Sequence, residues 1–270
     1  MTEQALADLD VVVDAQDLQL SHGDHVAVAG GSFRILGGTS VALIGPNGSG
    51  KSSVLDAVAG LLAVSGGSLE VLAGTGPGGG VAYVLQSTEI PAHLPMTVRE
   101  VVSMGRYRLT GLLRPMGGDG RRAVVQAMDR VGVADLADRQ VLELSGGQRQ
   151  RVLVAQGLVG DAALLLMDEP MTGLDLVSAE RIRRVISDER AAGRTVVFST
   201  HDLGEAAAAD RVVLLAGRVV ACGPPEEVLV ERHLMEAYRG HVMGIGGVTV
   251  IDDPHHHGSR SDRHDGHDHG

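Results

Sequence analysis

The sequence predicts an α/β fold whose core sheet is mostly parallel, and two observations lead to this prediction. The all-apolar run SVALI at residues 40–44 is typical of a strand buried on both faces, and an apolar-periodic helix starts soon after it, at Lys51. Three similar strand-like runs occur later, at residues 163–168, 195–200 and 211–216. Helical stretches lie between these runs, around residues 177–192 and 203–209. Strands and helices that alternate in this way usually form a parallel sheet.

The remaining segments change in character along the chain. Short apolar runs at residues 11–13 and 25–29 predict strands in the N-terminal part. The Gly-rich stretch 74–80 lies between two further strand-like runs, and we interpret it as a hairpin loop. From about residue 96 to residue 160 helical periodicity replaces the strand signals, which indicates a helical insertion. From residue 241 the chain turns Gly-rich and then His/Asp-rich, so we expect a tail outside the fold.

The composition excludes several classes of protein. With 270 residues, 44% hydrophobic and 21% charged, the chain can bury a sizeable core and is too apolar to be wholly disordered. A formal net charge of −11 argues against a nucleic-acid partner bound through a general basic surface. The lone Cys222 excludes an internal disulfide and a cysteine-built zinc site. No signal peptide is evident and no apolar run nears the roughly 20 residues of a membrane span, so we expect a cytoplasmic protein.

A phosphate-binding loop is predicted around the only lysine of the chain. The pattern G-x-x-x-x-G-K-[ST] is matched by Gly45, Pro46, Asn47, Gly48, Ser49, Gly50, Lys51 and Ser52, with Ser53 next in the helix. Glycines let backbone N–H groups surround phosphate oxygens, and the helix N-terminus adds its positive dipole end. Lys51 would reach the β- and γ-phosphates, and the Ser52 hydroxyl would ligate Mg²⁺. The loop alone is compatible with a kinase, a GTPase or an ATPase.

Two adjacent carboxylates stand at the end of the strand predicted at residues 163–168. Acids at the C-terminal end of a parallel strand face the crevice where ligands bind. Asp168 is suited to coordinate Mg²⁺, and Glu169 is suited to polarise a water for attack on the γ-phosphate. If the strand continues, the two side chains point in opposite directions and have different roles. The alternative interpretation is a solvated strand end.

A second helix N-terminus lies 20 residues upstream of these acids, in the sequence LSGGQRQR. Ser145 is expected to cap a helix that begins at Gln148, and Gly146 and Gly147 leave the amides exposed. Such an end binds phosphate, so the chain contains a second phosphate-binding device, which suggests a second nucleotide or a second subunit. The alternative interpretation is an ordinary capped helix.

Six motifs in their order and spacing together resemble the ABC-type ATPases. They are GPNGSGKSS, the glutamine of AYVLQ (Gln86), LSGGQRQR, LLLMDEP, GLD (Gly173 to Asp175) and STHD, which contains His201. LSGGQ shortly before a strand that ends in Asp-Glu-Pro is highly specific to this family. The resemblance implies a P-loop NTPase domain of ABC type over residues 1–240, with an N-terminal antiparallel β subdomain and a helical subdomain at about 90–160. A disordered His/Asp-rich tail would occupy residues 241–270.

The resemblance also implies the roles of individual residues. Two copies of the chain form a head-to-tail homodimer, and each ATP lies between the phosphate loop of one copy and Ser145, Gly146, Gly147 and Gln148 of the other. Glu169 is the catalytic base, and His201 is the switch residue that contacts the γ-phosphate. Gln86 approaches the Mg²⁺ and the attacking water and reports nucleotide occupancy to a membrane partner. Asp175 helps to join the sites of the two subunits.

The chain departs from the family pattern at the adenine position. The family usually places an aromatic residue upstream of the phosphate loop, and His22 occupies that position here. An imidazole can stack on a base, but over less area than a Tyr or Phe ring. Ser53 replaces a more usual Thr, and Leu85 replaces a Pro before Gln86; neither change removes a needed group.

The segment 86–107 resembles the importers that serve zinc or manganese, or iron–siderophore complexes. In that branch the segment docks a cytoplasmic helix of integral-membrane permease subunits, although helical core packing alone would give the same apolar pattern. The resemblance further implies attachment to the inner face of the membrane through the permease, and an extracytoplasmic substrate-binding protein in the same system.

The C-terminal tail is rich in metal-ligating side chains. Six histidines lie within its last 16 residues: His255, His256, His257, His264, His267 and His269. Imidazole together with the interleaved carboxylates suits Zn²⁺ and similar ions, and the alternative is a solvated tail without a ligand.

Three other functions are compatible with parts of the sequence. A P-loop kinase would not explain LSGGQ or STHD. A non-transport ABC switch protein, acting in translation or DNA repair, tends to carry two cassettes or a long coiled-coil insertion before LSGGQ, and this chain has neither. An exporter ATPase remains open, but the MGRY sequence at residues 104–107 and the His-rich tail favour an importer.

Overall fold

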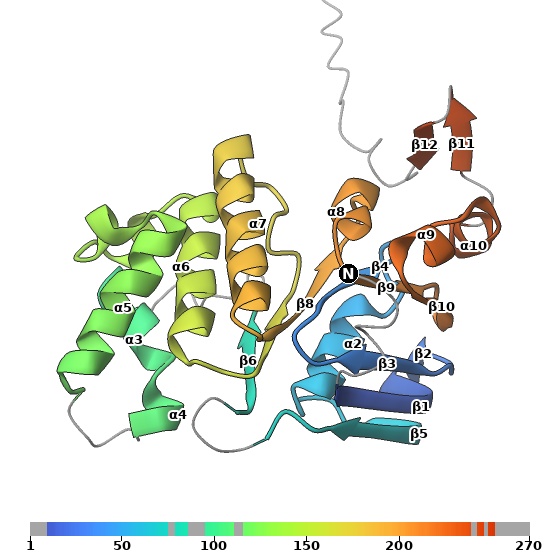
Figure 1. The fold of residues 1–270 in the computed structure, drawn as a ribbon, viewed down its shortest axis with the longest axis horizontal. Helices are drawn as coiled ribbons and strands as arrows, with labels where there is room; N and C mark the ends of the chain where they lie inside the picture. Colours follow the sequence, from blue (N-terminus) through green and yellow to red (C-terminus); the bar gives the residue numbers. More distant parts are fainter. Residues whose placement is uncertain are drawn as a thin grey trace, which may run out of the picture.

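A six-stranded core sheet is the framework of the protein (Figure 1). The structure is a computed structural model that describes residues 10–74, 79–85, 95–110, 116–238, 242–245 and 248–251. The strand order is β10–β9–β4–β8–β7–β6, and every neighbouring pair is parallel except β10 with β9. The strands are β4 (Ser40–Ile44), β6 (Val81–Val84), β7 (Leu164–Met167), β8 (Thr195–Thr200), β9 (Arg211–Leu215) and β10 (Val219–Gly223). The predicted α/β fold with a mostly parallel sheet is confirmed.

A second, antiparallel sheet is built from the N-terminal part of the chain. Its strands are β1 (Val11–His22), β2 (His25–Val28), β3 (Phe33–Leu36) and β5 (Val64–Val71), and β1 pairs with each of the other three. Because β5 pairs with β1 whereas β6 pairs with β7, the interpretation of residues 74–80 as a hairpin loop is wrong. Local apolar runs mark strands, but they do not say which strands pair.

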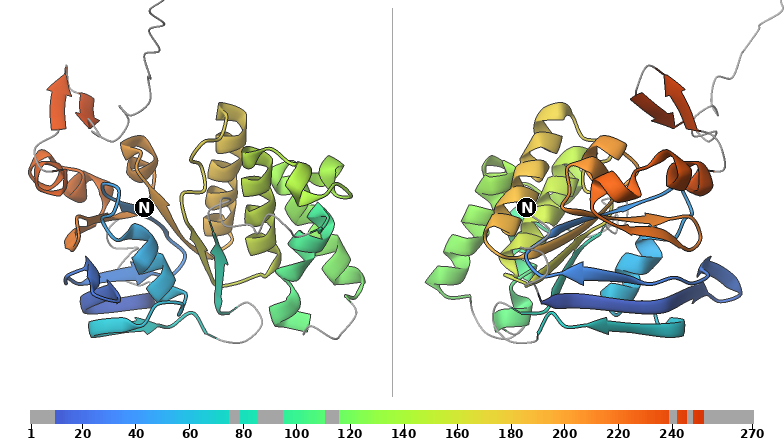
Figure 2. Two further views of the ribbon diagram at one scale, coloured as in Figure 1. Left: turned by 180° about the vertical axis from the view of Figure 1, so that it is seen from behind. Right: turned by 45° about the vertical axis from the view of Figure 1, so that its right-hand side comes forward.

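The helices lie on both sides of the core sheet. They are α2 (Lys51–Val58), α3 (Val98–Met104), α4 (Tyr107–Thr110), α5 (Gly118–Val131), α6 (Gly146–Val159), α7 (Leu176–Ala191), α8 (Leu203–Ala207), α9 (Pro225–Val228) and α10 (Glu231–Ala237). Two 3-10 turns, at Ala134–Leu136 and Val141–Glu143, connect α5 to α6. Helices α3 to α6 gather at one end of the molecule and the antiparallel sheet lies at the other, as Figure 1 and both views of Figure 2 show. The domain boundaries themselves remain a prediction.

The core sheet is buried on both faces, as the apolar run in β4 predicts. Ala42 and Ile44 belong to the apolar cluster that includes α5, α6 and α7, whereas Val41 and Leu43 belong to the cluster that includes α2 and the antiparallel sheet. Alternate side chains of one strand therefore anchor two layers. The C-terminal ends of β4, β7 and β8, which carry the predicted site, are fixed from both sides.

A short antiparallel pair, β11 (Val242–Ile245) with β12 (Val248–Ile251), lies in the segment expected to be a tail outside the fold. A sequence signal for it is present, since the β-branched run VTVI and the mostly apolar run VMGI lie on either side of Gly246 and Gly247. In the part of the chain that the structure describes, no helix has the length and apolar character to span a membrane. Within the same ranges no cluster of three or more His, Cys, Asp or Glu side chains could hold a metal ion.

Candidate functional site

The loop between β4 and α2 requires glycine for geometric reasons. Gly45, Gly48 and Gly50 have φ values of 158°, 75° and 98°. A Cβ at Gly45 would lie 2.0 Å from the Leu215 carbonyl oxygen, and one at Gly50 would lie 2.6 Å from a methyl of Val28. The loop is therefore tightly held against the neighbouring strands. Gly50 is also the N-cap of α2, without a side chain that would cover the first amides of the helix.

Lys51 points its ammonium group back along the loop. The Lys51 Nζ donates hydrogen bonds to the Gly45 carbonyl at 2.9 Å and to the Pro46 carbonyl at 3.1 Å, and the residue is 6% exposed. Next to it, Ser49 is 3% exposed, and its hydroxyl has no hydrogen-bond partner among the described residues. A buried hydroxyl without a partner is costly, so this atom points to a polar ligand at the loop.

A cavity of about 320 Å³ opens at this loop. It is lined by His22, His25, Ala27, Asn47, Gly48, Ser49, Gly50, Lys51, Ser52, Ser53 and Glu169. The cavity brings together nine residues that the sequence singles out: His22, Asn47 to Ser53 in the loop and the start of α2, and Glu169. Its size and its donors suit the phosphate and sugar part of a nucleotide.

His22, at the end of β1, is engaged with the loop helix. Its Nε2 lies 2.9 Å from the Ser53 hydroxyl. His25, directly opposite His22 in the β1–β2 pairing, lines the same cavity and was missed by sequence reasoning. The signal that could have found it is the sequence HGDH, in which a Gly-Asp turn brings the two histidines together.

The two acids after β7 lie differently from the alternation expected for a continuing strand. The strand ends at Met167, and Glu169 has a φ of 44°, so the condition of a continuing strand is not met and strand alternation does not orient the pair. Ser199 of β8 holds both residues: its hydroxyl donates to Asp168 Oδ1 at 2.5 Å and accepts from Glu169 N at 2.8 Å. Glu169 lines the cavity, whereas Asp168 lies next to it in the chain.

The predicted second phosphate-binding device is a well-capped helix end. Ser145 is the N-cap of α6: its hydroxyl accepts from Gln148 N at 3.3 Å, and Gln148 Oε1 accepts from Ser145 N at 2.9 Å. The helix begins at Gly146 rather than at Gln148, because Gly146 and Gly147 already adopt helical geometry after the cap. Ser145 and Gly146 are exposed, and the segment does not line the cavity of its own chain.

Asp175 and His201 are likewise exposed and outside this cavity. Asp175 is the N-cap of α7, and hydrogen bonds from the backbone and hydroxyl of Ser178, at 2.9 Å and 2.8 Å, hold the pKa of its carboxyl below its ordinary value. His201 directly follows β8, at the same sheet end as Asp168. Gln86 and the six tail histidines lie outside the described residues.

The chain is similar in sequence to ATP-binding proteins of metal transport systems. The profile of the ABC transporter family matches residues 28–172. The chelated iron transport system membrane protein YfeB of Yersinia pestis is 34% identical, over 90% of this chain and 84% of that protein. The zinc transport system ATP-binding protein TroB of Treponema pallidum is 38% identical over 85% and 88%. The manganese transport system ATP-binding protein MntA of a Synechocystis strain is 33% identical over 87% and 92%.

Solved structures agree with the fold. A transporter assigned to the metal-chelate type of ABC transporters, in an inward-facing conformation, matches with a TM-score of 0.75 at 24% identity, over 89% of this chain and 96% of that chain. A dimeric ATP-binding cassette in a post-hydrolysis state, bound to ADP and phosphate, matches with a TM-score of 0.68 at 24% identity, over 79% and 98%. At such identities the likeness concerns the fold.

Proposed function

The chain belongs to the ABC transporter family, and from that premise we propose that it is the ATP-hydrolysing subunit of an importer for a transition-metal ion such as zinc or manganese. The single observation that carries the ATPase part is the cavity lined by Lys51, Glu169 and Ser49, whose hydroxyl has no hydrogen-bond partner within the described ranges. Binding at the loop neutralises phosphate charge, and the carboxylate supplies a base on the same cavity wall.

The sites of the enzyme are completed by a second copy of the chain. Ser145 to Gln148 form a capped helix end that does not line the cavity of its own chain, and Ser145 and Gly146 are exposed, so this end is available to the nucleotide of a partner. A two-fold homodimer then has two equivalent sites. Exposed apolar residues follow Asp175, with Leu176 and Val177 at 85% and 67% exposure, and a partner surface would cover them.

In this proposal residues of both copies take part in hydrolysis, each with a separate role. The loop from Gly45 to Ser53 binds the phosphates, and His22 contacts the nucleoside end. Glu169 accepts a proton from the attacking water, while His201 and Gln86 contact the γ-phosphate region and the water. Asp175 and Ser145 to Gln148 close the site from the subunit interface. Glu169→Gln is expected to keep nucleotide binding and to lose turnover, because an amide cannot accept the proton.

Mg²⁺ is proposed to accompany ATP. The donors fit it: Ser52 offers an exposed hydroxyl at the loop, and Asp168 offers a carboxylate oriented by Ser199. Gln86 would be a further oxygen ligand. When bound, the ion neutralises charge on the phosphates.

The import of a metal ion is supported by the relatives, which are ATP-binding proteins of zinc and manganese systems. By this proposal the subunit attaches to the inner face of the membrane through integral-membrane permease subunits, and an extracytoplasmic substrate-binding protein delivers the ion. The test is uptake of radioactive zinc, manganese and chelated iron in cells that lack the gene. Restoration of zinc or manganese uptake by the wild type but not by Glu169→Gln supports the proposal. The proposal is contradicted if the wild type restores only the uptake of chelated iron, or if it restores the uptake of none of the three.

The His-rich tail is proposed to bind Zn²⁺ through imidazole and carboxylate groups. Its candidate ligands are His255, His256, His257, His264, His267 and His269. Truncation after residue 250 is expected to leave ATP hydrolysis intact and to lower Zn²⁺ binding in calorimetry. Unchanged Zn²⁺ binding contradicts this role of the tail.

A further inference from the structure

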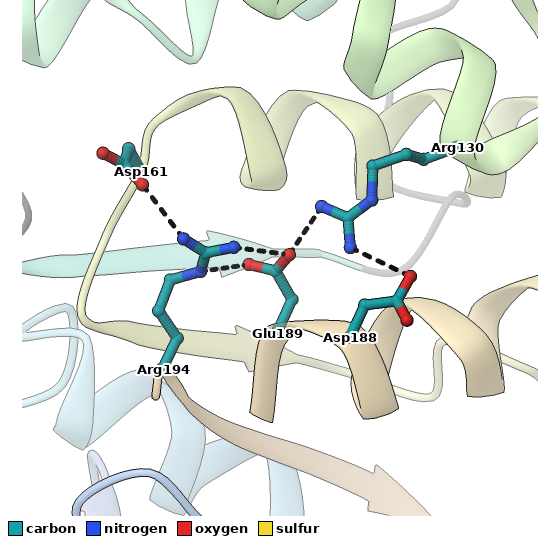
Figure 3. Close-up of polar contacts among 5 residues, drawn as sticks. All are labelled: Arg130, Asp161, Asp188, Glu189 and Arg194. Carbon is teal, nitrogen blue, oxygen red and sulfur yellow. Dashed lines mark hydrogen bonds and ion pairs between the residues drawn. The ribbon is translucent and has the colours of Figure 1, made fainter. Parts of the chain in front are cut away.

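A buried carboxylate joins the helical end of the molecule to the core sheet. Glu189, near the end of α7, is 2% exposed. Arg130 of α5 donates to its Oε1 at 2.5 Å, and Arg194, just before β8, donates to Oε2 at 2.5 Å and to Oε1 at 2.8 Å. Figure 3 shows the two guanidinium groups on either side of this carboxylate. A buried charge is stable only with such partners, so the three residues are mutually dependent.

Two further acids extend the contact to the surface. Asp161, just after α6, lies 3.2 Å from Arg194, and Asp188 lies 3.6 Å from Arg130. The hydrogen bonds to Glu189 raise the pKa of the Arg194 guanidinium above its ordinary value, against the opposing effect of its burial. Arginine is required here because each planar guanidinium reaches two acceptors at once, as a lysine ammonium cannot in the same geometry.

The C-terminal end of α5 is also bound directly to α6. Arg151 of α6 donates to the carbonyl oxygens of Val131 and Gly132, at 3.1 Å and 2.8 Å. These carbonyls are the ones that a helix end leaves without intrahelical partners. On the other side, a Cβ at Gly132 would lie 2.9 Å from the Arg181 guanidinium of α7. Three helices therefore meet at one point through arginine side chains.

The elements that meet there lead to the proposed site. Helix α6 starts at the Ser145 cap, α7 starts at the Asp175 cap, and β8 continues from the Arg194 region to Ser199, which holds Asp168. Contacts that hold α5 and α6 against α7 and β8 therefore also set the position of Ser145 relative to the phosphate loop. This follows because α6, a helix of 14 residues, moves as a rigid unit with its N-cap.

We propose that Glu189, Arg130 and Arg151 are positioning residues, which hold α5 and α6 at the orientation on the core that lets Ser145 to Gly147 reach the nucleotide of a second copy. None of the three lines the cavity. The inference rests on the proposed function, since it concerns the assembly of that same site. By this inference the three residues affect the rate of hydrolysis and the closure of the dimer, and they do not affect nucleotide affinity.

The experiment compares Arg130→Met and Arg151→Met with Arg122→Met in the full-length chain. Arg122, on α5, is the matched control, because its exposed ion pair with Asp119 lies within one helix and outside the segment 86–107. Nucleotide affinity, kcat for ATP and thermal unfolding are measured for each variant. Arg130→Met and Arg151→Met are expected to lower kcat per folded molecule by about tenfold and to change nucleotide affinity less than about twofold. Arg130→Lys, which keeps the charge, is expected to recover part of kcat.

Three outcomes overturn the inference. The first is an unchanged kcat per folded molecule in Arg130→Met and Arg151→Met. The second is a loss of nucleotide affinity equal to the loss of kcat. The third is an equal effect of Arg122→Met. If Arg130→Met does not fold, Arg130→Lys and Arg151→Met decide by the same criteria. Absence of hydrolysis by the wild-type chain with its permease would contradict the proposed function instead, so the two failures are distinguishable.

Discussion

The Ser199 hydroxyl on β8 donates a hydrogen bond to Asp168 Oδ1 at 2.5 Å, across the gap between two neighbouring strands. The same hydroxyl accepts a hydrogen bond from Glu169 N at 2.8 Å. Ser199 is fully buried, so one side chain orients the proposed metal ligand and fixes the backbone of the proposed base. The acids are thus held in place before any nucleotide binds.

Ser199→Ala is expected to lower kcat by about tenfold, because a hydrogen bond to a charged group contributes roughly 1.5–3 kcal/mol and its loss frees both acids. Nucleotide affinity measured without Mg²⁺ is expected to change little. The measurement is steady-state ATP hydrolysis with a parallel titration of nucleotide. Ser187→Ala, on the exposed side of α7, is the control. A folded Ser199→Ala protein with wild-type kcat would show that the bridge has no part in hydrolysis.

The glycines of the phosphate loop are expected to differ in their tolerance of a methyl group. Gly50→Ala places a Cβ 2.6 Å from Val28 and 2.8 Å from the Ala27 carbonyl oxygen, at a positive φ. Its free energy of unfolding should fall by about 2–5 kcal/mol, from left-handed strain plus overpacking. Gly48→Ala, where nothing lies within 4 Å of the added Cβ, should lose only about 1–2 kcal/mol. Urea unfolding measures the free energy of unfolding of both variants. An equal decrease in the two variants would refute the steric argument.

The only lysine of the chain should not be replaceable by arginine, although the other basic residues are all arginine. Lys51 is buried between carbonyls of its own loop, where a compact ammonium fits and a planar guanidinium does not. Lys51→Arg and Lys51→Ala are both expected to abolish nucleotide binding or hydrolysis. Arg184→Lys, on an exposed part of α7, should leave both unchanged. Wild-type hydrolysis by Lys51→Arg would contradict this assignment.

Asp175 provides a prediction for pH. Its pKa is lowered by hydrogen bonds from Ser178, so the folded state favours the carboxylate. The cap therefore stabilises the fold above the ordinary pKa of 3.8, and the stabilisation is lost as pH falls through the lowered pKa. Ser178→Ala removes the hydroxyl donor but keeps the backbone donor, so the pKa of Asp175 should rise only part of the way. NMR titration of the carboxyl carbon measures it, and an unchanged pKa would contradict the role of the hydroxyl.

The sequence predicted those features that depend on local pattern. The run SVALI and the loop after it predict a buried strand, a phosphate loop and a helix, and β4, the loop and α2 are found there. Ser145 was expected to cap a helix, and it does. Periodicity and capping are properties of neighbours in the chain, which is why they can be read directly.

The features that were not predicted depend on partners far along the chain. Strands β5 and β6 are adjacent in sequence but pair in different sheets, so no local signal distinguishes them from a hairpin. Glu189 stands in the charged run SDER, which is typical of a solvated helix face, yet it is buried because Arg130 and Arg194 reach it from 59 and 5 residues away. The hydrogen bonds of the Ser199 hydroxyl to Asp168 and Glu169 likewise could not be predicted from local sequence, because they depend on the pairing of β7 with β8.

The central claim is that each nucleotide lies between two copies of this chain, and mixing two inactive variants tests it most directly. Lys51→Ala disables the loop of its own copy, and Ser145→Arg disables the surface that the copy offers to its partner. In a 1:1 mixture half of the dimers contain both variants, and each of these has one intact site, so about a quarter of wild-type ATP hydrolysis should return. A mixture as inactive as the separate variants would contradict the claim.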